Sequence, residues 1–342
     1  MAYTTIDDPT IYFIINKYTG SSGSQTFNLG FQPDLIWTKN LNTGYNHVVV
    51  DSVRGNTKVL EPNTTDAEGT ATDAITSFNS NGYTVGANTS SGGFEDDFNG
   101  TYNSPSYVAF CWKESPTAGF DILTFTGNAS GNQTISHNLS AVPKWWNIKR
   151  LGQASNWCTY HVGLGGADHN VFLNANSSNQ TDTAIWNNTL PTSSVFSVGN
   201  NIDANGNGAS HIWYGWAEKQ GFSKFGSYTG NGNSDGPFVY TGHRPAWVMI
   251  KGYTNTGSWR INDNKREPFN VMDTLLFADT NDGDTTNSGY SIDFLSNGFK
   301  IRGTNASANA SGVAYIFMAF AESPFINSKS VPTNARWPCY KK

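Results

Sequence analysis

One pattern occurs three times along the 342 residues of this chain. An aromatic-Thr-Gly triplet opens each copy, at Tyr18, Phe125 and Tyr228. A segment that runs from Pro to Lys with the same spacing follows, at residues 33–39, 143–149 and 245–251. An aromatic stretch ending in Glu closes each copy, and Glu114, Glu218 and Glu322 lie 104 residues apart. This period exceeds the roughly 20–50 residues of a solenoid repeat and matches one small domain of about 100 residues.

Each copy has the signals of short β-strands joined by tight turns. The chain has 35 Gly, 14% aromatic and 14% charged residues, against roughly 25% charged residues in a typical protein. Asn-Gly at residues 81–82 and 297–298 predicts two hairpins, and the second copy keeps only a remnant at residues 195–199. No segment has a sustained helical period. We therefore predict an all-β chain of three tandem antiparallel β-sandwich domains, jelly-roll or concanavalin-like, of about 104 residues each.

The repeat also predicts where the domains begin and end. We expect sandwiches at residues 1–117, 118–221 and 222–326, with a polar C-terminal tail at residues 327–342. The second domain departs most from the shared pattern. The linkers are only a few residues long, so we expect neighbouring domains to pack against one another and to share an interface.

Charge and composition argue against several classes of protein. The net charge of −5 provides no basic field for a polyanion, so we expect no nucleic-acid partner. The apolar runs fall short of the roughly 20 residues of a membrane span, and the first residues lack the pattern of a secretory signal. Three Cys at unrelated places in the repeat argue against a disulfide framework. Cys111 occupies the position of Gly215 and Ala319, which predicts a small buried residue.

The recurring charged residues favour structure over catalysis. Lys39, Lys149 and Lys251 recur with the closing Glu at strand ends, where an ion pair or a hydrogen bond to a turn is expected. The facing carboxylates of a glycosidase are not evident, and the six His lack zinc or triad spacing. His47 and His161 are predicted to occupy corresponding strand positions. We therefore predict that the protein is not an enzyme. A glycan-degrading enzyme is kept as an alternative, second to the structural alternative given below.

One acidic loop gives a weak calcium candidate. It comprises Asp279, Asn281, Asp282 and Asp284, whose oxygens suit a hard cation. The loop departs from EF-hand spacing, with Tyr290 where the Glu ligand would stand. A solvated turn is the favoured interpretation, and we expect no cofactor other than a structural Ca²⁺ here.

Aromatic residues near the turns are the remaining binding candidates. Trp145 and Trp146 are adjacent on a strand and must face opposite ways, so one of them is expected outside the core. Aromatic faces beside Asn and Asp suit a sugar. The candidate ligand-binding residues are Trp146, Trp157, Trp186, Tyr253 and Trp259. The alternative, which we favour, is packing between domains or between subunits.

Several motifs together resemble a known family. They are Thr-Ile-Asp-Asp-Pro at residues 5–9, Asp-Ser-Val-Arg-Gly at residues 51–55, the hairpin at residues 78–83, and Glu-Ser-Pro-Phe with Val-Pro-Thr-Asn-Ala-Arg at residues 322–325 and 331–336. In these the chain resembles a β-sandwich repeat protein of marine tailed bacteriophages, and the resemblance covers nearly the whole sequence. The second copy lacks both the Asp-Ser-x-Arg-Gly turn and the Asn-Gly hairpin.

The resemblance implies a non-enzymatic structural protein on the exterior of the phage particle, made in the host cytoplasm. Other virion proteins are its expected partners. A host-surface glycan or receptor is a further expected partner if the chain is a tail-fibre or receptor-binding component. The alternative is a head decoration protein, such as a cement protein or capsid fibre. We expect a homo-oligomer, with a trimer favoured, or three domains that themselves imitate a threefold ring.

Overall fold

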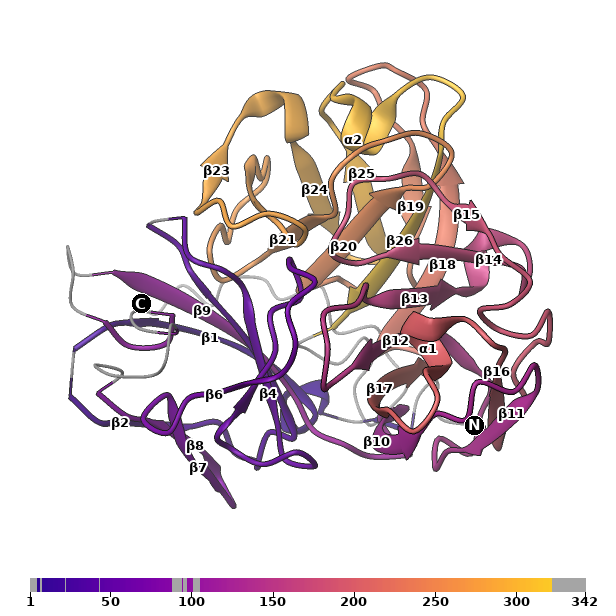
Figure 1. The fold of residues 1–342 in the computed structure, drawn as a ribbon. Coiled ribbons are helices and arrows are strands. Elements are labelled where there is room, and N and C mark those ends of the chain that lie inside the picture. The colour runs from indigo at the N-terminus through magenta and orange to yellow at the C-terminus, as the bar shows by residue number, and fades with distance from the viewer. Residues whose placement is uncertain are drawn as a thin grey trace.

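The computed structural model describes residues 5–321, apart from residues 7, 22, 43, 88–93, 95–96 and 101–104. These residues form antiparallel β-sheets with only short helices, so the all-β prediction is confirmed (Figure 1). We call the segments that carry β1–β9, β10–β17 and β18–β26 units 1, 2 and 3. Glu322 and the expected tail, residues 327–342, lie outside the described residues. No helix in the described part of the chain is long and apolar enough to cross a membrane.

The elements of the three units follow one another in the same order. Unit 1 has a 3-10 turn (Pro9–Ile11), β1 (Phe13–Thr19), β2 (Gln25–Asn28), β3 (Leu35–Asn40), β4 (Val48–Asp51), β5 (Lys58–Val59), β6 (Gly69–Thr70), β7 (Ile75–Asn79), β8 (Gly82–Val85) and β9 (Ser106–Trp112). Unit 2 has β10 (Phe120–Thr126), β11 (Gln133–Ser136), β12 (Pro143–Arg150), β13 (Cys158–His161), a 3-10 turn (Val162–Leu164), β14 (His169–Phe172), β15 (Gln180–Thr181), β16 (Val195–Val198), α1 (Ile202–Asn205) and β17 (Ser210–Ala217). Unit 3 has β18 (Ser223–Thr229), β19 (Phe238–Tyr240), β20 (Trp247–Gly252), β21 (Arg260–Asp263), β22 (Thr274–Phe277), β23 (Thr285–Thr286), a 3-10 turn (Ser288–Tyr290), β24 (Ile292–Leu295), β25 (Gly298–Ile301), α2 (Ala306–Asn309) and β26 (Ala314–Phe320).

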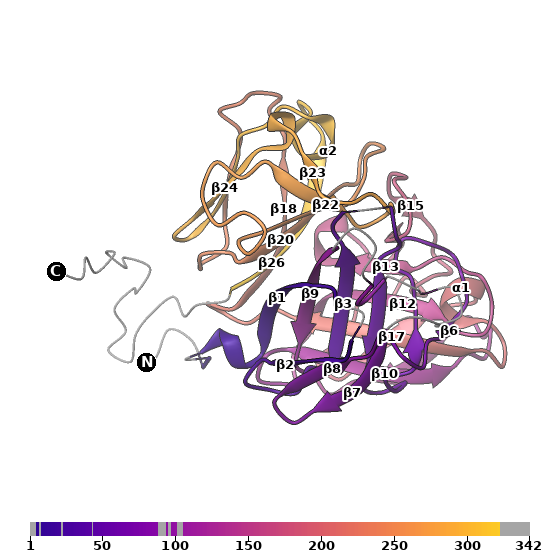
Figure 2. The same ribbon diagram turned by 90° about the vertical axis from the view of Figure 1, so that its left-hand side faces the viewer.

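Each unit pairs a large sheet with a small one. The large sheets have the orders β1-β9-β3-β4, β10-β17-β12-β13-β14-β15 and β18-β26-β20-β21-β22-β23. In unit 1 a bridge between Val49 and Leu60 continues the sheet toward β5 and β6. The small sheets have the orders β2-β8-β7, β11-β16 and β19-β25-β24. Figure 2 shows the small sheet of unit 1 on the far side of its large sheet from β20 and β26.

The Asn-Gly hairpins form as predicted in units 1 and 3. Asn79 pairs with Gly82 between β7 and β8, and Leu295 pairs with Gly298 between β24 and β25. In unit 2 the described residues place only β16 against β11, in agreement with the missing Asn-Gly signal. The turn residues therefore decide locally whether a small sheet has three strands or two.

A shared aromatic core lies where the large sheets of the three units meet. The ring of Trp112 in unit 1 lies 6.1 Å from that of Trp216 in unit 2. It also lies 5.8 Å from Trp247 and 5.7 Å from Phe320, both in unit 3. Three further apolar clusters fill the space between the sheets of each unit. In Figure 1 the indigo-to-violet, magenta and orange-to-yellow units surround this common centre.

The units are joined head to tail in a closed ring, because the same contacts recur at all three junctions. The amide of Glu68 in unit 1 donates to the carbonyl of Leu151 in unit 2 at 2.8 Å. The amide of Asn179 in unit 2 donates to Tyr253 in unit 3 at the same distance. The amide of Asp284 in unit 3 donates to Leu41 in unit 1, also at 2.8 Å, and so closes the ring within one chain.

Candidate functional site

The predicted ligand-binding tryptophans are buried, so that prediction is wrong for Trp146, Trp157, Trp186 and Trp259. Trp145 and Trp146 do face opposite ways, as expected. Both faces of β12 are covered, however: Trp145 stacks on Trp216 at 4.1 Å in the shared core. Trp146 stacks on Tyr160 at 3.9 Å inside unit 2. Ring closure covers a sheet face that a free sandwich would leave in water.

Trp157 and Trp259 form hydrogen bonds across the junctions between units and do not face a ligand. The indole nitrogen of Trp157 donates to the carbonyl of Glu61 in unit 1 at 3.0 Å. That of Trp259 donates to Phe172 in unit 2 at 2.9 Å. Tyr253, partly buried, packs against the shared core. The favoured alternative, packing between units, is therefore confirmed for these residues.

His47 is the third member of this set, and this corrects the predicted match between His47 and His161. The register pairs Leu35 with Asp51 and Trp145 with His161, so His161 corresponds to Asp51. His47 precedes β4 as Trp157 precedes β13. It accepts from Trp37 at 3.0 Å and donates to the carbonyl of Phe277 in unit 3 at 3.0 Å. Burial lowers the pKa of His47 well below its usual value, which leaves a neutral ring that bridges the third junction.

The calcium candidates hold the loop that closes the ring and do not converge on one point. Asp279 accepts from the amide of Trp259 at 2.8 Å, and Asp284 pairs with Arg266 at 2.7 Å. The amide group of Asn281 donates to the carbonyl of Gly44 in unit 1 at 2.9 Å. Asp282 accepts from Thr280 at 2.9 Å. Among the described residues no three His, Cys, Asp or Glu side chains gather as a metal site. The four residues therefore do not form the calcium ligand set that the sequence suggested.

The recurring lysines form hydrogen bonds to turns, as expected from the repeat. Lys149 donates to the carbonyl of Thr65 in unit 1 at 2.9 Å and to that of Ser155 at 2.6 Å. Lys251 donates in the same way to Asn176 in unit 2 at 2.9 Å. Burial lowers the pKa of Lys39, Lys149 and Lys251 to about 8. The ammonium groups of Lys149 and Lys251 each join their unit to the preceding one, and Lys39 donates to the carbonyl of Asn40 in its own unit.

The closing glutamates have different partners at two junctions. Glu218 pairs with Lys224 at 2.7 Å. Glu114 lies instead near Asp121 and Asp34. The pKa of Glu114 is raised to about 7, mainly because the side chain is partly buried and also because these two carboxylates are close. The expected ion pair is therefore present at Glu218, whereas Glu114 lies among groups of its own charge.

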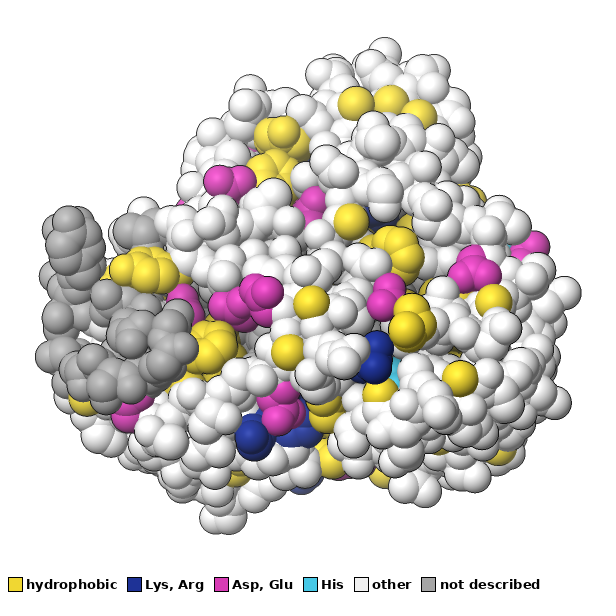
Figure 3. Space-filling model, in the orientation of Figure 1, with side chains coloured by type: hydrophobic (Ala, Val, Ile, Leu, Met, Phe, Trp, Pro, Cys, Tyr) yellow, Lys and Arg dark blue, Asp and Glu magenta, His cyan; other side chains and the backbone are white. Residues whose placement is uncertain are grey.

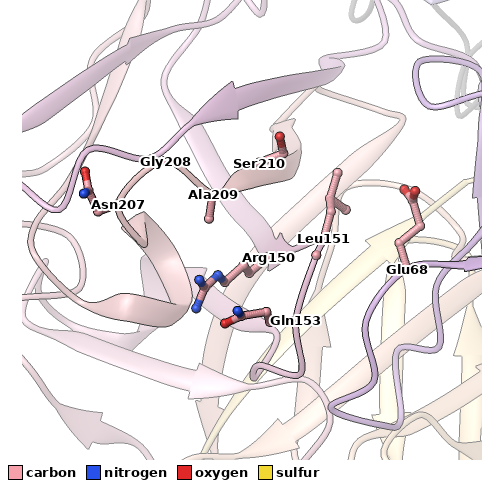
Figure 4. A pocket seen from close by; sticks show the side chains of 9 residues that line it. Glu68, Arg150, Leu151, Gln153, Asn207, Gly208, Ala209 and Ser210 are labelled. Carbon is pink, nitrogen blue, oxygen red and sulfur yellow. The ribbon is translucent and has the colours of Figure 1, made fainter.

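A cleft of about 580 Å³ lies between units 1 and 2 (Figure 4). Its lining comes from Glu68, the end of β12 with the turn after it, and the segment before β17. In Figure 4 Glu68 lies at one end and Asn207 at the other, with Arg150 and Gln153 between them. Glu68 is paired with Arg54 at 3.2 Å and with Lys58 at 3.4 Å.

Arg150 gives this cleft its chemical character. Its Nε is buried and has no hydrogen-bond partner, and Arg150 makes no ion pair with any described residue. Gly206 leaves the room, since a Cβ there would lie 3.1 Å from the guanidinium carbon. The corresponding residues are Asn40 in unit 1 and Gly252 in unit 3, judged from their partners on β9, β17 and β26. The cleft can hold a small anion, but its lining includes only one carboxylate, so it does not supply a glycosidase pair.

A second solvent-exposed feature missed by the sequence analysis is the edge strand β19 of unit 3. Phe238 and Tyr240 are 46% and 56% exposed. Tyr240 lines two shallow hollows, and Phe238 lines one of them. Aligning the three copies by strand register would have found them, because units 1 and 2 have small polar residues there. On the face shown in Figure 3 most of the surface is uncharged, with few acidic or basic side chains.

Two comparisons with known proteins bear on this chain. The family model described as domain of unknown function DUF7483 matches residues 8–324. A search of curated proteins found no match.

Proposed function

The chain belongs to the DUF7483 family, a domain of unknown function, and we propose that it is a non-enzymatic structural protein on the exterior of a tailed-phage particle. The observation that carries the proposal is the ring that closes inside one chain. A closed ring of equivalent units fits a partner surface that itself has threefold symmetry, because each unit then meets an equivalent patch. Such a partner is a symmetric assembly.

Rigidity supports the same role. Trp112, Trp216 and Trp247 meet in one core, and a hydrogen bond from His47, Trp157 or Trp259 crosses each junction. Units locked in this way do not swing relative to one another. A protein that holds its loops in fixed relative positions suits decoration of a head or presentation of a binding surface at a tail. Host-surface adhesion and head decoration are the two forms of the proposal.

Immunogold labelling of intact particles tests the proposal and separates its two forms. An antibody against the folded chain should label particles, with pre-immune serum as the control. Label at tail tips means adhesion, and label spread evenly over the head means decoration. Particles without label contradict the proposal. Release of reducing sugars from host envelope polysaccharide would instead support the alternative of a glycan-degrading enzyme.

A further inference from the structure

The outer edge of unit 3 differs from the same edge in units 1 and 2. Tyr240, Asn28 and Ser136 occupy the same position in the three units, because they pair with Gly298, Gly82 and Val195 at the start of the neighbouring strand. Two residues earlier, Phe238 corresponds to Thr26 and Thr134. All six positions are exposed. Since two units build this strand from small polar residues, the fold does not require aromatic side chains there. Their presence in unit 3 calls for another explanation.

The neighbouring strand β18 differs as well, and this difference opens the space. Gly226 stands where unit 1 has Asn16 and unit 2 has Leu123. The side chain of Asn16 bonds to Tyr83 at 3.0 Å, and Leu123 packs against the core of unit 2. Gly226 fills none of this space, and a hollow of about 260 Å³ lies between β18 and β19.

Tyr240 separates this hollow from a second one of about 290 Å³. Lys224 and Tyr240 line both, Phe238 and Phe317 line the first, and Ser223 and Thr241 line the second. Together they make one groove with an aromatic ridge, to which Ser227 adds an exposed hydroxyl group. The hydroxyl groups of Ser223 and Thr241 are buried and already donate to backbone carbonyls. Each hollow lies near or below the lower limit of roughly 300 Å³ for ligand pockets, a size suited to a small ring.

The charges along this groove are neutralised in pairs. Lys224 pairs with Glu218 at 2.7 Å, and Lys300, opposite Phe238, pairs with Asp235 at 2.8 Å. The surface therefore offers aromatic faces and neutral or paired hydrogen-bonding groups, and no free charge of either sign among these residues. An uncharged ligand that has both C–H faces and hydroxyl groups is complementary to it.

We propose that the groove of Phe238 and Tyr240 binds a neutral oligosaccharide. The inference names a ligand for the adhesion form of the proposed function, and it rests on that function for the assumption that the sugar comes from a host surface. An added peptide strand fits less well, because β19 is only three residues long and follows Pro237, which offers no amide hydrogen. A sugar needs only the side chains.

The test uses the purified full chain and an array of neutral and acidic oligosaccharides, followed by calorimetric titration of the bound ones. Phe238→Thr and Tyr240→Ser copy the residues of unit 2, so we expect both variants to fold, as circular dichroism will check. Leu190→Ser, at an apolar side chain that is 62% exposed in unit 2, is the matched control. We expect at least one neutral oligosaccharide to bind. Tyr240→Ser and Phe238→Thr should each weaken that binding about tenfold or more, while Leu190→Ser leaves it unchanged.

Other outcomes overturn the inference. These are no bound neutral oligosaccharide, binding of acidic sugars alone, or binding that the two groove variants leave intact. A dimer that Tyr240→Ser dissociates, in the absence of sugar binding, would assign the groove to a second copy of the chain. The labelling experiment is independent: sugar binding without label on particles removes the phage setting, and label without sugar binding removes this site.

Discussion

The centre of the ring and its outer edges use the repeat in different ways. At the centre the three copies keep large apolar residues in register, such as Trp112, Trp216 and Phe320. At the edge the register positions of Phe238 are occupied by Thr26 and Thr134. Trp112 touches its counterparts in both other units, so a change at this position must fit two neighbours. An edge residue meets solvent or a ligand and is free to differ.

The junctions show an intermediate case. Glu114 and Glu218 occupy the same place after β9 and β17, but their neighbours on the next strand are Asp121 and Lys224. One junction therefore holds a cluster of carboxylates and the other an ion pair. The backbone contacts stay the same while the side-chain electrostatics change. Four predictions test how far the contrast between centre and edge holds.

The largest effect is expected at the centre. Trp112→Ala removes the ring that contacts both other units, and such a truncation costs roughly 3–5 kcal/mol of the free energy of unfolding. Trp216→Phe copies the residue of unit 3 at the same place and keeps an aromatic ring, so it should cost less than Trp112→Ala. Denaturant unfolding measures both. A loss below about 1 kcal/mol for Trp112→Ala would show that the units stand independently.

A smaller effect is expected where a lysine joins two units. Lys149→Met removes hydrogen bonds to Thr65 and Ser155, and we expect a loss of about 1–3 kcal/mol. Lys144→Met, on the same strand but with a partly exposed side chain, is the control and should stay within about 0.5 kcal/mol.

The pH dependence sharpens this second prediction. The pKa of Lys149 is lowered to about 8 in the folded state from its ordinary 10.5. Between these values the unfolded chain holds a proton that the folded protein has released, so the contribution of Lys149 to stability rises with pH. The difference in melting temperature between wild type and Lys149→Met should therefore widen from pH 8 toward pH 10.5. A constant difference would mean that the amine stays charged at the junction.

The repeat in the sequence was sufficient for the fold class, because turn chemistry and β-rich runs act locally. It located the hairpin of Asn79 and Gly82 and the buried slot of Cys111, which is inaccessible to solvent. The three-domain division stays a prediction, since the units share a core. Alternation along a strand tells which residues face opposite ways, but not that both faces are buried. Ring closure covers Trp145, whereas Trp146 lies between the sheets of unit 2. Alternation alone does not tell which of the two faces lies between the sheets, and Trp146 was therefore assigned to a ligand.

Register explains the remaining differences. His47 and His161 lie at similar distances along their copies, yet strand pairing sets them four positions apart in the repeat. The same register reveals Arg150, Phe238 and Tyr240 as departures from the other copies. Contacts between units, such as those of the loop around Asn281, depend on how the ring closes. No local pattern contains that information.

A smaller effect is expected from pH at the first junction. The pKa of Glu114 is raised from 4.5 to about 7, so between these values the folded state keeps a proton that the unfolded chain has lost. Stability should fall as pH rises through this window, by on the order of 1 kcal/mol because Glu114 is partly exposed to solvent. Glu114→Gln should remove this dependence in thermal melts. Glu218→Gln is the matched control, and an identical pH profile for the two variants would remove the distinction between the junctions.

The smallest effect is expected at the edge of unit 3. The double variant Phe238→Thr, Tyr240→Ser gives β19 the residues that unit 2 has in the same register, and both native side chains are largely exposed. We expect the free energy of unfolding to change by no more than about 0.5 kcal/mol, the usual range for surface positions. Denaturant unfolding without sugar is the measurement. A loss above about 1.5 kcal/mol would make the aromatic pair part of the packing of unit 3, and the edge would then be as constrained as the centre. A neutral result together with lost sugar binding would mean that this strand is free to change for a ligand because the shared core alone holds the ring together.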